Sequence, residues 1–411
     1  MSAITLFYII IGILSFSFLL ERIIGHLNAK HYNNTLSKEI KDIYNDVEYK
    51  NAQNYKALNY KFSLLTSTFT FVTTLSFIIY NGFGYVDNIA RQYSQNPIII
   101  ALIFFGIIAL GNTLINIPFS YYSTFVIEEK FGFNKTSTKT FVLDKIKGLI
   151  ITAIAGGALL ALVIWIYLTV QYFWIYAWGL ITIVSLLINM FYSKLIVPLF
   201  NKQTALPQGN LRDGISKYAQ SVGFEIDKIY VIDGSKRSTK ANAYFSGFGS
   251  EKRVTLYDTL LNNLDEEEVI AVLAHEVGHY KKRHIIYNMI TSTLLTGLTL
   301  FLFALFVSNP MLSQALGVSK HSFHIGLIAF GILYTPFSEI TGLIMNFISR
   351  AFEYQADNYA KNTYKATPLI TALKKLSKNS MSNLTPHKAH VFLNYSHPTL
   401  LQRIKNLNKN T

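Results

Sequence analysis

Long apolar stretches without charge alternate along the chain with polar segments rich in lysine. A bilayer core is crossed by about 20 apolar helical residues. Residues 149–193 hold no charged residue, and 45 residues in a row suffice for two crossings joined by a turn near Gln171–Trp174. The first stretch is longer than the roughly 7–15 residues of a signal-peptide core, so we expect it to be retained. The pattern predicts seven membrane spans: Ala3–Leu20, Phe62–Val86, Ile98–Ile127, two within 149–193, Ile285–Val307 and His324–Ile348.

The placement of basic residues orients these spans. With the first end of the chain outside, the inner segments are 21–61, 128–148, 194–284 and 349–411, and they carry 35 of the 37 Lys and Arg. The positive-inside rule expects this skew, and contact with anionic lipid accounts for the net charge of +14. We therefore expect a multi-pass protein with its polar segments in the cytoplasm, in the inner membrane of a bacterium or the endoplasmic reticulum of a eukaryote. No basic–aromatic module appears, so nucleic acid is not an expected partner.

Composition narrows the chemistry. Hydrophobic residues make up 51% of the chain and charged residues 15%, against about 25% charged in soluble domains. Cysteine is absent, which rules out disulfides, thiolate ligands and a cysteine nucleophile. Any bound metal must therefore be held by nitrogen and oxygen atoms.

The inner segment 194–284 has the pattern of a small α/β unit. A linker bearing proline and glycine precedes three strand-like runs, and Gly247 and Gly249 predict a turn between the last two. The runs are Lys228–Asp233, Ala241–Phe248 and Arg253–Leu261. The chain then divides into four parts: spans one to five with their loops (1–197), a cytoplasmic segment with the strand-like runs (198–284), spans six and seven (285–348) and a cytoplasmic C-terminal segment (349–411).

A helix carrying a metal-binding motif follows the last strand-like run. Asp265 and Glu268 have the spacing of a capping box, which predicts that the helix begins there. Ten residues on, the helix reads His275-Glu276-Val277-Gly278-His279. Histidines four apart project from one helical face and can bind one zinc ion. Glu276 lies on the flank, where it can take a proton from a water whose pKa the zinc lowers to about 7.

A third ligand is expected, because catalytic zinc takes three protein ligands and one water. After His279 the chain crosses the membrane twice and returns to the same side. The first acid after re-emergence is Glu353, and Asp357 lies one helical turn further on. We predict that Glu353 binds the zinc and that Asp357 accepts a hydrogen bond from a ligand imidazole.

Several separate motifs, in order, resemble the type I CAAX prenyl endopeptidases, which are integral-membrane zinc metalloproteases. The resemblance covers most of the chain. The motifs are Glu128-Glu129-Lys130-Phe131-Gly132-Phe133-Asn134, Pro198-Leu199-Phe200-Asn201-Lys202, Asn242-Ala243-Tyr244-Phe245, His275 to His279, Phe352-Glu353-Tyr354-Gln355-Ala356-Asp357 and Ser396-His397-Pro398.

The resemblance implies a mainly α protein: a barrel of seven transmembrane helices around a water-filled chamber, with a small α/β zinc protease domain on the cytoplasmic side. It implies that Glu276 is the general base and that His397 stabilises the tetrahedral intermediate. It also implies that Asn242 and Ala243 belong to a strand that holds the substrate, and that Arg403, near His397, contributes to substrate binding. The implied substrate is a prenylated C-terminus that loses its last three residues.

Two other functions fit the same residues. A quality-control protease that degrades damaged membrane proteins would share the zinc site but accept segments without lipid. A transporter or channel with a structural zinc belongs to another class, and an open fourth zinc position argues against it because structural sites are closed. The sequence by itself does not decide whether the peptide or protein substrate is prenylated, and it does not set the oligomeric state.

Overall fold

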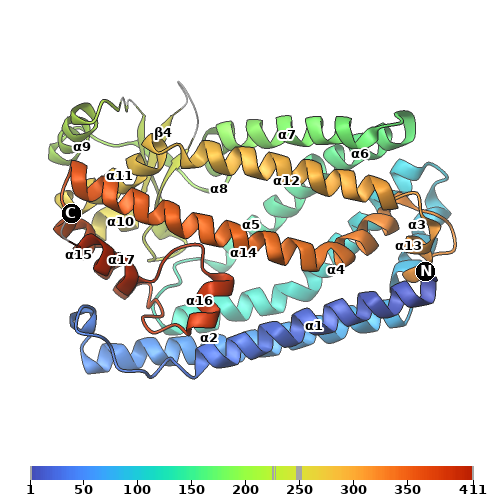
Figure 1. Cartoon of the computed structure of the whole chain (residues 1–411), viewed down its shortest axis with the longest axis horizontal. Helices are drawn as coiled ribbons and strands as arrows, with labels where there is room; N and C mark the ends of the chain where they lie inside the picture. Colours follow the sequence, from blue (N-terminus) through green and yellow to red (C-terminus); the bar gives the residue numbers. More distant parts are fainter. Residues whose placement is uncertain (1, 225, 227, 247–251, 410–411) are drawn as a thin grey trace.

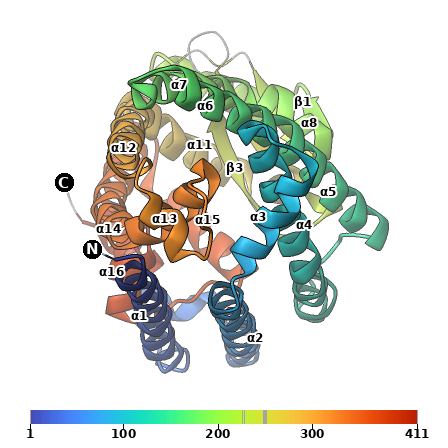
Figure 2. The same cartoon turned by 90° about the vertical axis from the view of Figure 1, so that its right-hand side faces the viewer.

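The computed structural model describes every residue except 1, 225, 227, 247–251 and 410–411. Within that part of the chain, seven helical segments are long and apolar enough to cross a membrane. They run side by side along the long axis of the molecule (Figure 1) and form a ring when seen end-on (Figure 2). The predicted mainly α fold with seven spans is therefore confirmed. The segments are Ala3–Ala29, Asp46–Ile79, Pro97–Glu128, Thr138–Thr169, Phe173–Phe200, His284–Phe306 and Phe323–Thr363.

Short π-helical turns interrupt two of these spans and end a third. The turns are Ser123–Glu128, Thr152–Gly156 and Tyr192–Ile196. The first turn follows α4 (Pro97–Tyr122). The second separates α5 (Thr138–Ile151) from α6 (Gly157–Thr169), and the third separates α7 (Phe173–Phe191) from α8 (Val197–Phe200). The uninterrupted spans are α1 (Ala3–Ala29), α2 (Asp46–Ile79), α12 (His284–Phe306) and α14 (Phe323–Thr363).

The second predicted span, Phe62–Val86, is wrong at its C-terminal end. Helix α2 ends at Ile79, and Val86 lies in the separate helix α3 (Gly82–Tyr93). Asn81 between them adopts a left-handed conformation with φ 57°, which asparagine tolerates better than most residues and which a continuous α-helix does not contain. Apolar composition continued past the break, so hydropathy alone did not reveal it.

The segment after α8 forms a four-stranded sheet in the order β1-β2-β4-β3. The strands are β1 (Gln203–Ala205), β2 (Ile229–Ile232), β3 (Ala243–Ser246) and β4 (Arg253–Tyr257). The β2–β4 pair is parallel and the other two pairs are antiparallel, with Ala243 opposite Leu256. Strand β3 is thus an edge strand among the described residues.

Two predictions for this sheet need correction or fall outside the description. The run Arg253–Leu261 is a strand only as far as Tyr257, because helix α10 (Asp258–Asn263) begins at the next residue. Asp258 accepts hydrogen bonds from Ser235, which turns the chain away from the sheet. The turn predicted at Gly247 and Gly249 lies outside the described residues.

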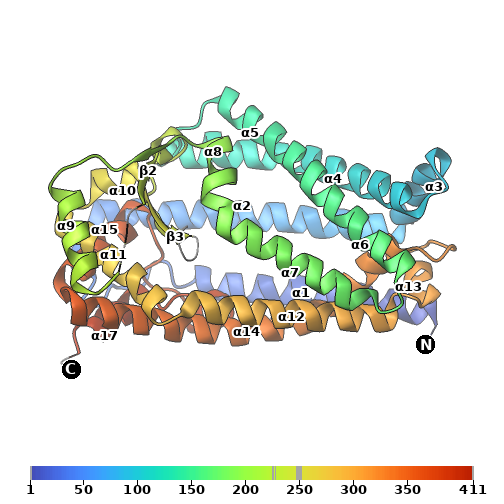
Figure 3. The same ribbon diagram turned by 90° about the horizontal axis from the view of Figure 1, so that it is seen from above.

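Short helices pack against the sheet at one end of the molecule, and other short helices lie at the opposite end of the ring of membrane spans. The sheet lies with α9 (Asn210–Ser221), α11 (Glu266–Lys281), α15 (Ala366–Asn379) and α17 (Leu400–Leu407) around a buried apolar core (Figure 3). Helix α3 and helix α13 (Pro310–Ala315) lie at the opposite end, and α16 (Lys388–Asn394) lies against α14 and α1. The four-part division into 1–197, 198–284, 285–348 and 349–411 remains a prediction.

Candidate metal centre

Helix α11 carries the two histidines of the motif. Asp265 and Glu268 form the predicted capping box, in which the Asp265 backbone N–H donates to Glu268 Oε2 at 2.9 Å. The helix is buried along most of its length and packs most extensively against α14. The close approach depends on Gly278, because a Cβ there would lie 3.1 Å from the Cα and the carbonyl oxygen of Ala356. Side chains of α11 and α14 can therefore bind the same metal ion.

His275, His279 and Glu353 converge on one point, with one ligand atom from each lying within 4.8 Å of the others. The two Nε2 atoms are 3.2 Å apart. Glu353 Oε1 is 3.3 Å from His279 Nε2, and Glu353 Oε2 is 3.5 Å from His275 Nε2. The sequence predicted that these three residues lie together. In the structure, His275 and His279 of α11 meet Glu353 of α14, after the chain has passed through the hairpin of α12 and α14.

The arrangement fits a zinc ion. Two ligand atoms about 2.05 Å from a tetrahedral zinc are about 3.3 Å apart, which matches the 3.2 Å between the two Nε2 atoms and the 3.3 Å between His279 Nε2 and Glu353 Oε1. Glu353 Oε2 is buried and has no hydrogen-bond partner among the described residues. Only longer contacts reach this oxygen, from Arg403 Nη1 at 3.4 Å and His275 Nε2 at 3.5 Å, and a metal ion would satisfy it more fully. The donors are nitrogen and oxygen only, as the lack of cysteine requires.

A second layer of charged groups holds the ligands in place. Asp357 is fully buried, and its Oδ1 lies 2.9 Å from His275 Nδ1. Arg403 from α17 donates to both oxygens of Asp357, through Nη2 at 2.6 Å and Nε at 2.9 Å, and its Nη1 lies 3.4 Å from Glu353 Oε2. With Nδ1–H directed at Asp357, His275 Nε2 is the nitrogen that gives up its proton when a metal binds, and its lone pair then points into the ligand cluster.

The same contacts set the protonation of His275. Burial and the nearby Arg403 lower the pKa of this imidazole, but the hydrogen bonds to Asp357 and Glu353 outweigh them and raise the pKa to about 9. A metal ion must displace the proton that His275 holds at neutral pH. Metal binding is therefore expected to strengthen as the pH rises toward 9.

A cavity of about 510 Å³ opens beside the ligands. Glu276 and His397 line it, and His397 Nε2 lies 3.2 Å from Glu353 Oε1 while 62% of the His397 side chain remains exposed. Ala243, the first residue of the edge strand β3, and Asn242 just before it also line this cavity. Arg403 also borders this cavity, although its guanidinium group is occupied by Asp357.

Two family models match almost the whole chain. The model described as the CAAX prenyl protease N-terminal region, with five membrane helices, matches residues 26–202, and the model described as peptidase family M48 matches residues 205–411. The chain belongs to peptidase family M48. The predicted resemblance is confirmed, and the chain is a metalloprotease.

This M48 peptidase matches several named relatives over most of its own length and most of theirs. The CAAX prenyl protease 1 homolog of Oryza sativa is 34% identical over 91% of this chain and 90% of its own length. CAAX prenyl protease 1 of Saccharomyces cerevisiae is 35% identical over 89% of this chain and 86% of its own. The crystal structure of S. mikatae Ste24p matches with a TM-score of 0.92 and 34% identity, covering 98% of this chain and 99% of that one.

Sequence reasoning missed a hydrogen-bond chain behind His279. His284 is buried, and its Nδ1 lies 3.0 Å from His279 Nδ1 while its Nε2 lies 3.0 Å from Gln355 Oε1. Its ring stacks on Phe352 at 4.1 Å. Because Gln355 Oε1 can only accept, His284 Nε2 carries the proton, His284 Nδ1 accepts, and His279 Nδ1 donates. His279 Nε2 is thereby left free to bind metal. A ligand imidazole needs a partner for its second nitrogen, but no local pattern in the sequence showed that His284 and Gln355 supply it.

Replacing His284 by alanine is expected to weaken zinc binding by about 10–100-fold, the usual cost of removing a group that orients a ligand. Competition with a fluorescent chelator measures the affinity in the purified peptidase. The control is His390→Ala, because His390 lies in α16 and borders a different cavity. Equal affinities in the two variants would show that His284 does not orient His279.

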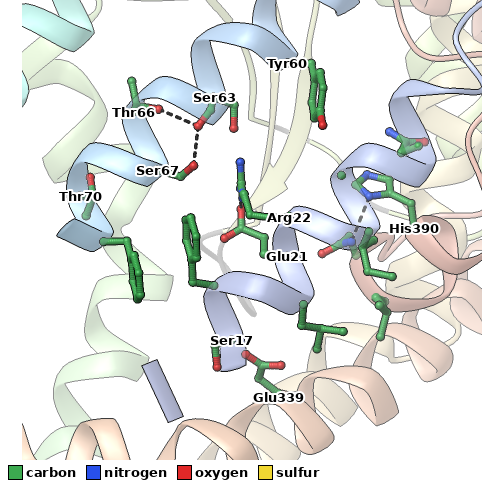
Figure 4. Close-up of a pocket in the computed structure, with 18 of the residues that line it drawn as sticks. Ser17, Glu21, Arg22, Tyr60, Ser63, Thr66, Ser67, Thr70, Glu339 and His390 are labelled. Atoms are coloured by element: carbon green, nitrogen blue, oxygen red, sulfur yellow. Dashed lines mark hydrogen bonds and ion pairs between the residues drawn. The ribbon is translucent and has the colours of Figure 1, made fainter. Parts of the chain in front are cut away.

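The membrane helices of the peptidase enclose a larger cavity of about 1070 Å³. Its wall includes Glu21 and Arg22 of α1, Glu339 of α14 and a row of hydroxyl side chains on α2, which face the same space (Figure 4). Charged groups within spans are expensive unless they face a cavity or pair with each other, and Arg22 Nη2 indeed lies 2.6 Å from Glu21 Oε1. The polar part of this wall suits the predicted water-filled chamber, while the rest of the lining, including Leu14, Phe18 and Phe71, is apolar. The hydroxyl residues are Ser63, Thr66, Ser67, Thr70 and Thr74.

Proposed function

We propose that this M48 peptidase is a zinc endopeptidase that removes the last three residues of prenylated C-terminal peptides at the cytoplasmic face of the membrane. One observation carries the proposal: the cluster of His275, His279 and Glu353 shares a cavity with Glu276 and with β3, which is an edge strand among the described residues. The names of the relatives, CAAX prenyl proteases, support the choice of substrate. The excess of Lys and Arg in the inner segments supports the cytoplasmic placement of the site.

We assign the zinc to His275, His279 and Glu353, one ion per chain. When bound there, zinc acts as a Lewis acid that lowers the pKa of a water molecule to about 7 and polarises the scissile carbonyl. Asp357 holds the His275 ring through Nδ1, and Arg403 fixes Asp357 with two hydrogen bonds. On this basis we propose that Arg403 positions the ligands rather than binding the substrate.

Glu276 acts as the general base and acid of the reaction. Its carboxylate takes a proton from the attacking water and then passes it to the leaving amine. His397 donates a hydrogen bond to the oxyanion of the tetrahedral intermediate. Its exposure and its contact with Glu353 Oε1 support this role, because the imidazole borders the cavity beside the ligands.

The peptide binds as an added strand along β3. Residues 241–245 border the cavity, and β3 pairs with β4 on its other side. An extended peptide that pairs with such an edge gains affinity from backbone hydrogen bonds with little demand on sequence. Asn242 and Ala243, at the start of the strand, lie where this pairing would begin. A prenyl chain buried in apolar surroundings adds about 0.8 kcal/mol per CH₂, which makes the lipid the main source of selectivity.

The test compares two peptides of the same sequence, one with a farnesyl group and one without. Purified wild-type enzyme is expected to release the C-terminal tripeptide much faster from the farnesylated peptide, and chelation of zinc should stop both reactions. The variant Glu276→Gln measures the background. Equal rates for the two peptides would contradict prenyl selectivity and favour the quality-control protease. Membership in a peptidase family leaves no support for the transporter alternative.

A further inference from the structure

The motif at residues 128–134 lies outside the metal site, and it begins where the span Pro97–Glu128 ends. The backbone N–H groups of Phe133 and Asn134 both donate to the carbonyl oxygen of Glu128, at 2.8 and 3.3 Å. Just before them, Gly132 has φ 77°, a left-handed conformation that glycine adopts without steric cost. The motif therefore ends the helix and turns the chain back.

The residues after this turn form a short antiparallel pair with residues 237–239, which lead into β3. The Lys135 backbone N–H donates to the carbonyl oxygen of Arg237 at 3.0 Å, and the Thr239 N–H donates to that of Phe133 at 3.1 Å. An isolated two-stranded pair is marginally stable at best. Side-chain contacts must therefore fix the position of the segment that precedes β3.

An ion pair between Lys240 and Glu128 supplies that fixation. Lys240 Nζ donates to Glu128 Oε2 at 2.6 Å and to the Tyr55 hydroxyl at 3.0 Å, and this hydroxyl donates to Glu128 Oε1. The ammonium group also lies 4.4 Å from the centre of the buried Phe133 ring. Burial lowers the pKa of Lys240, but the hydrogen bonds to Glu128 and Tyr55 outweigh burial and raise the pKa. Lys240 is therefore charged at neutral pH.

Lys240 is not among the described residues that line the cavity beside the zinc ligands, but the lining begins with the next residue, Ala241. The carbonyl oxygen of Lys240 accepts a hydrogen bond from Thr259 Oγ1 at 3.1 Å, and that of Asn242 accepts one from the Tyr257 N–H at 3.1 Å. A displacement of Lys240 would therefore move the start of the strand edge. The zinc ligands lie on α11 and α14 and would not move with it.

We propose that Lys240 and Glu128 are positioning residues for the peptide substrate, because their ion pair fixes the start of β3 in the register that an extended peptide needs. The inference rests on the proposed binding of the peptide along β3. Tyr55 and Glu128 belong to the spans Asp46–Ile79 and Pro97–Glu128. The membrane helices, through these two side chains, thus hold the strand that the peptide pairs with.

The experiment measures KM and kcat of the detergent-solubilised full chain for the farnesylated peptide and for the same peptide without the farnesyl group. Lys240→Met removes the charge but keeps an unbranched side chain. We expect KM to rise about tenfold for both peptides, which corresponds to the loss of about one backbone hydrogen bond to the substrate. The kcat and the zinc content should stay at the wild-type values.

Two more variants test whether the ion pair is the cause. Glu128→Gln breaks the same contact from the membrane side and should raise KM by the same factor. The double variant should be no worse than either single variant, because both substitutions remove one shared contact. Lys240→Arg keeps the charge and should restore a KM close to that of the wild type. A KM in Lys240→Arg as high as in Lys240→Met would contradict the ion pair as the cause.

The matched control is Lys374→Met. Lys374 of α15 forms an ion pair with Asp42 at 2.8 Å and is not among the described residues that line the cavity, so the wild-type KM is expected. A wild-type KM in both Lys240→Met and Glu128→Gln, with only a lower melting temperature, would reduce the pair to a structural role and overturn the proposal. Loss of zinc in these variants would do the same.

The two proposals fail in different ways. Equal cleavage of the two peptides by the wild type would contradict prenyl selectivity, but it would leave the KM comparison intact for the peptide without lipid. If Lys240→Met does not fold, as its melting curve and zinc content would show, Glu128→Gln decides the question.

Discussion

Replacing Glu276 by glutamine is expected to lower kcat by about 10²–10⁴-fold, the usual contribution of a positioned general base, while the zinc content stays the same. Glutamine keeps the shape of the side chain but cannot take a proton from water. Glu276 is not among the three residues whose ligand atoms converge, so its replacement leaves the metal site intact. Cleavage of the farnesylated peptide and elemental analysis of the same sample give the two quantities.

The control for this substitution is Glu266→Gln, because Glu266 is an exposed residue in the first turn of the same helix. It should have the kcat and zinc content of the wild type. Cleavage by purified Glu276→Gln at the wild-type rate would contradict the assignment of the base. A simultaneous loss of zinc would instead place Glu276 in the ligand set.

Replacing Glu353 by alanine is expected to remove zinc from the purified protein and to abolish cleavage with it. Glu353 supplies the one carboxylate of the ligand set, and its buried Oε2 has no hydrogen-bond partner in the described structure. Two imidazoles alone leave the ion with too few protein ligands for a stable catalytic site. Zinc per chain is measured by elemental analysis after dialysis.

Two further variants separate ligand loss from misfolding. Glu353→Gln preserves the size of the side chain beside Arg403 and should also lose zinc, because a neutral amide is a much weaker ligand than a carboxylate. Glu339→Ala, on the same helix α14 but in the wall of the chamber, should keep one zinc per chain. Full zinc occupancy in both Glu353 variants would remove this residue from the proposed ligand set.

The parts of the site that follow from helical periodicity could be predicted from the sequence. His275 and His279 share a face because they are four residues apart, and Glu353 was found because a hairpin of two spans returns the chain to the same side of the membrane. The structure places their ligand atoms within 4.8 Å of one another. Local spacing and topology were sufficient for these residues.

Features that depend on tertiary contacts could not be predicted in the same way. His284 and Gln355 are 71 residues apart, and no local pattern signals that they share a hydrogen bond. The break at Asn81 and the early end of β4 at Tyr257 are set by single backbone conformations and side-chain contacts, while hydropathy and strand propensity continue past both points. Hydropathy also marks only the part of a helix that lies in lipid, so it missed the extension of α14 to Thr363 that carries Glu353.

Diffraction from crystals of the active, zinc-loaded enzyme at the zinc absorption edge tests the central claim most directly. Anomalous density is expected to show one ion per chain, about 2.0–2.2 Å from His275 Nε2, His279 Nε2 and a carboxylate oxygen of Glu353, with its fourth position open to the cavity that Glu276 and His397 border. An ion bound elsewhere, or a Glu353 carboxylate far from the two imidazoles in an active molecule, would contradict it.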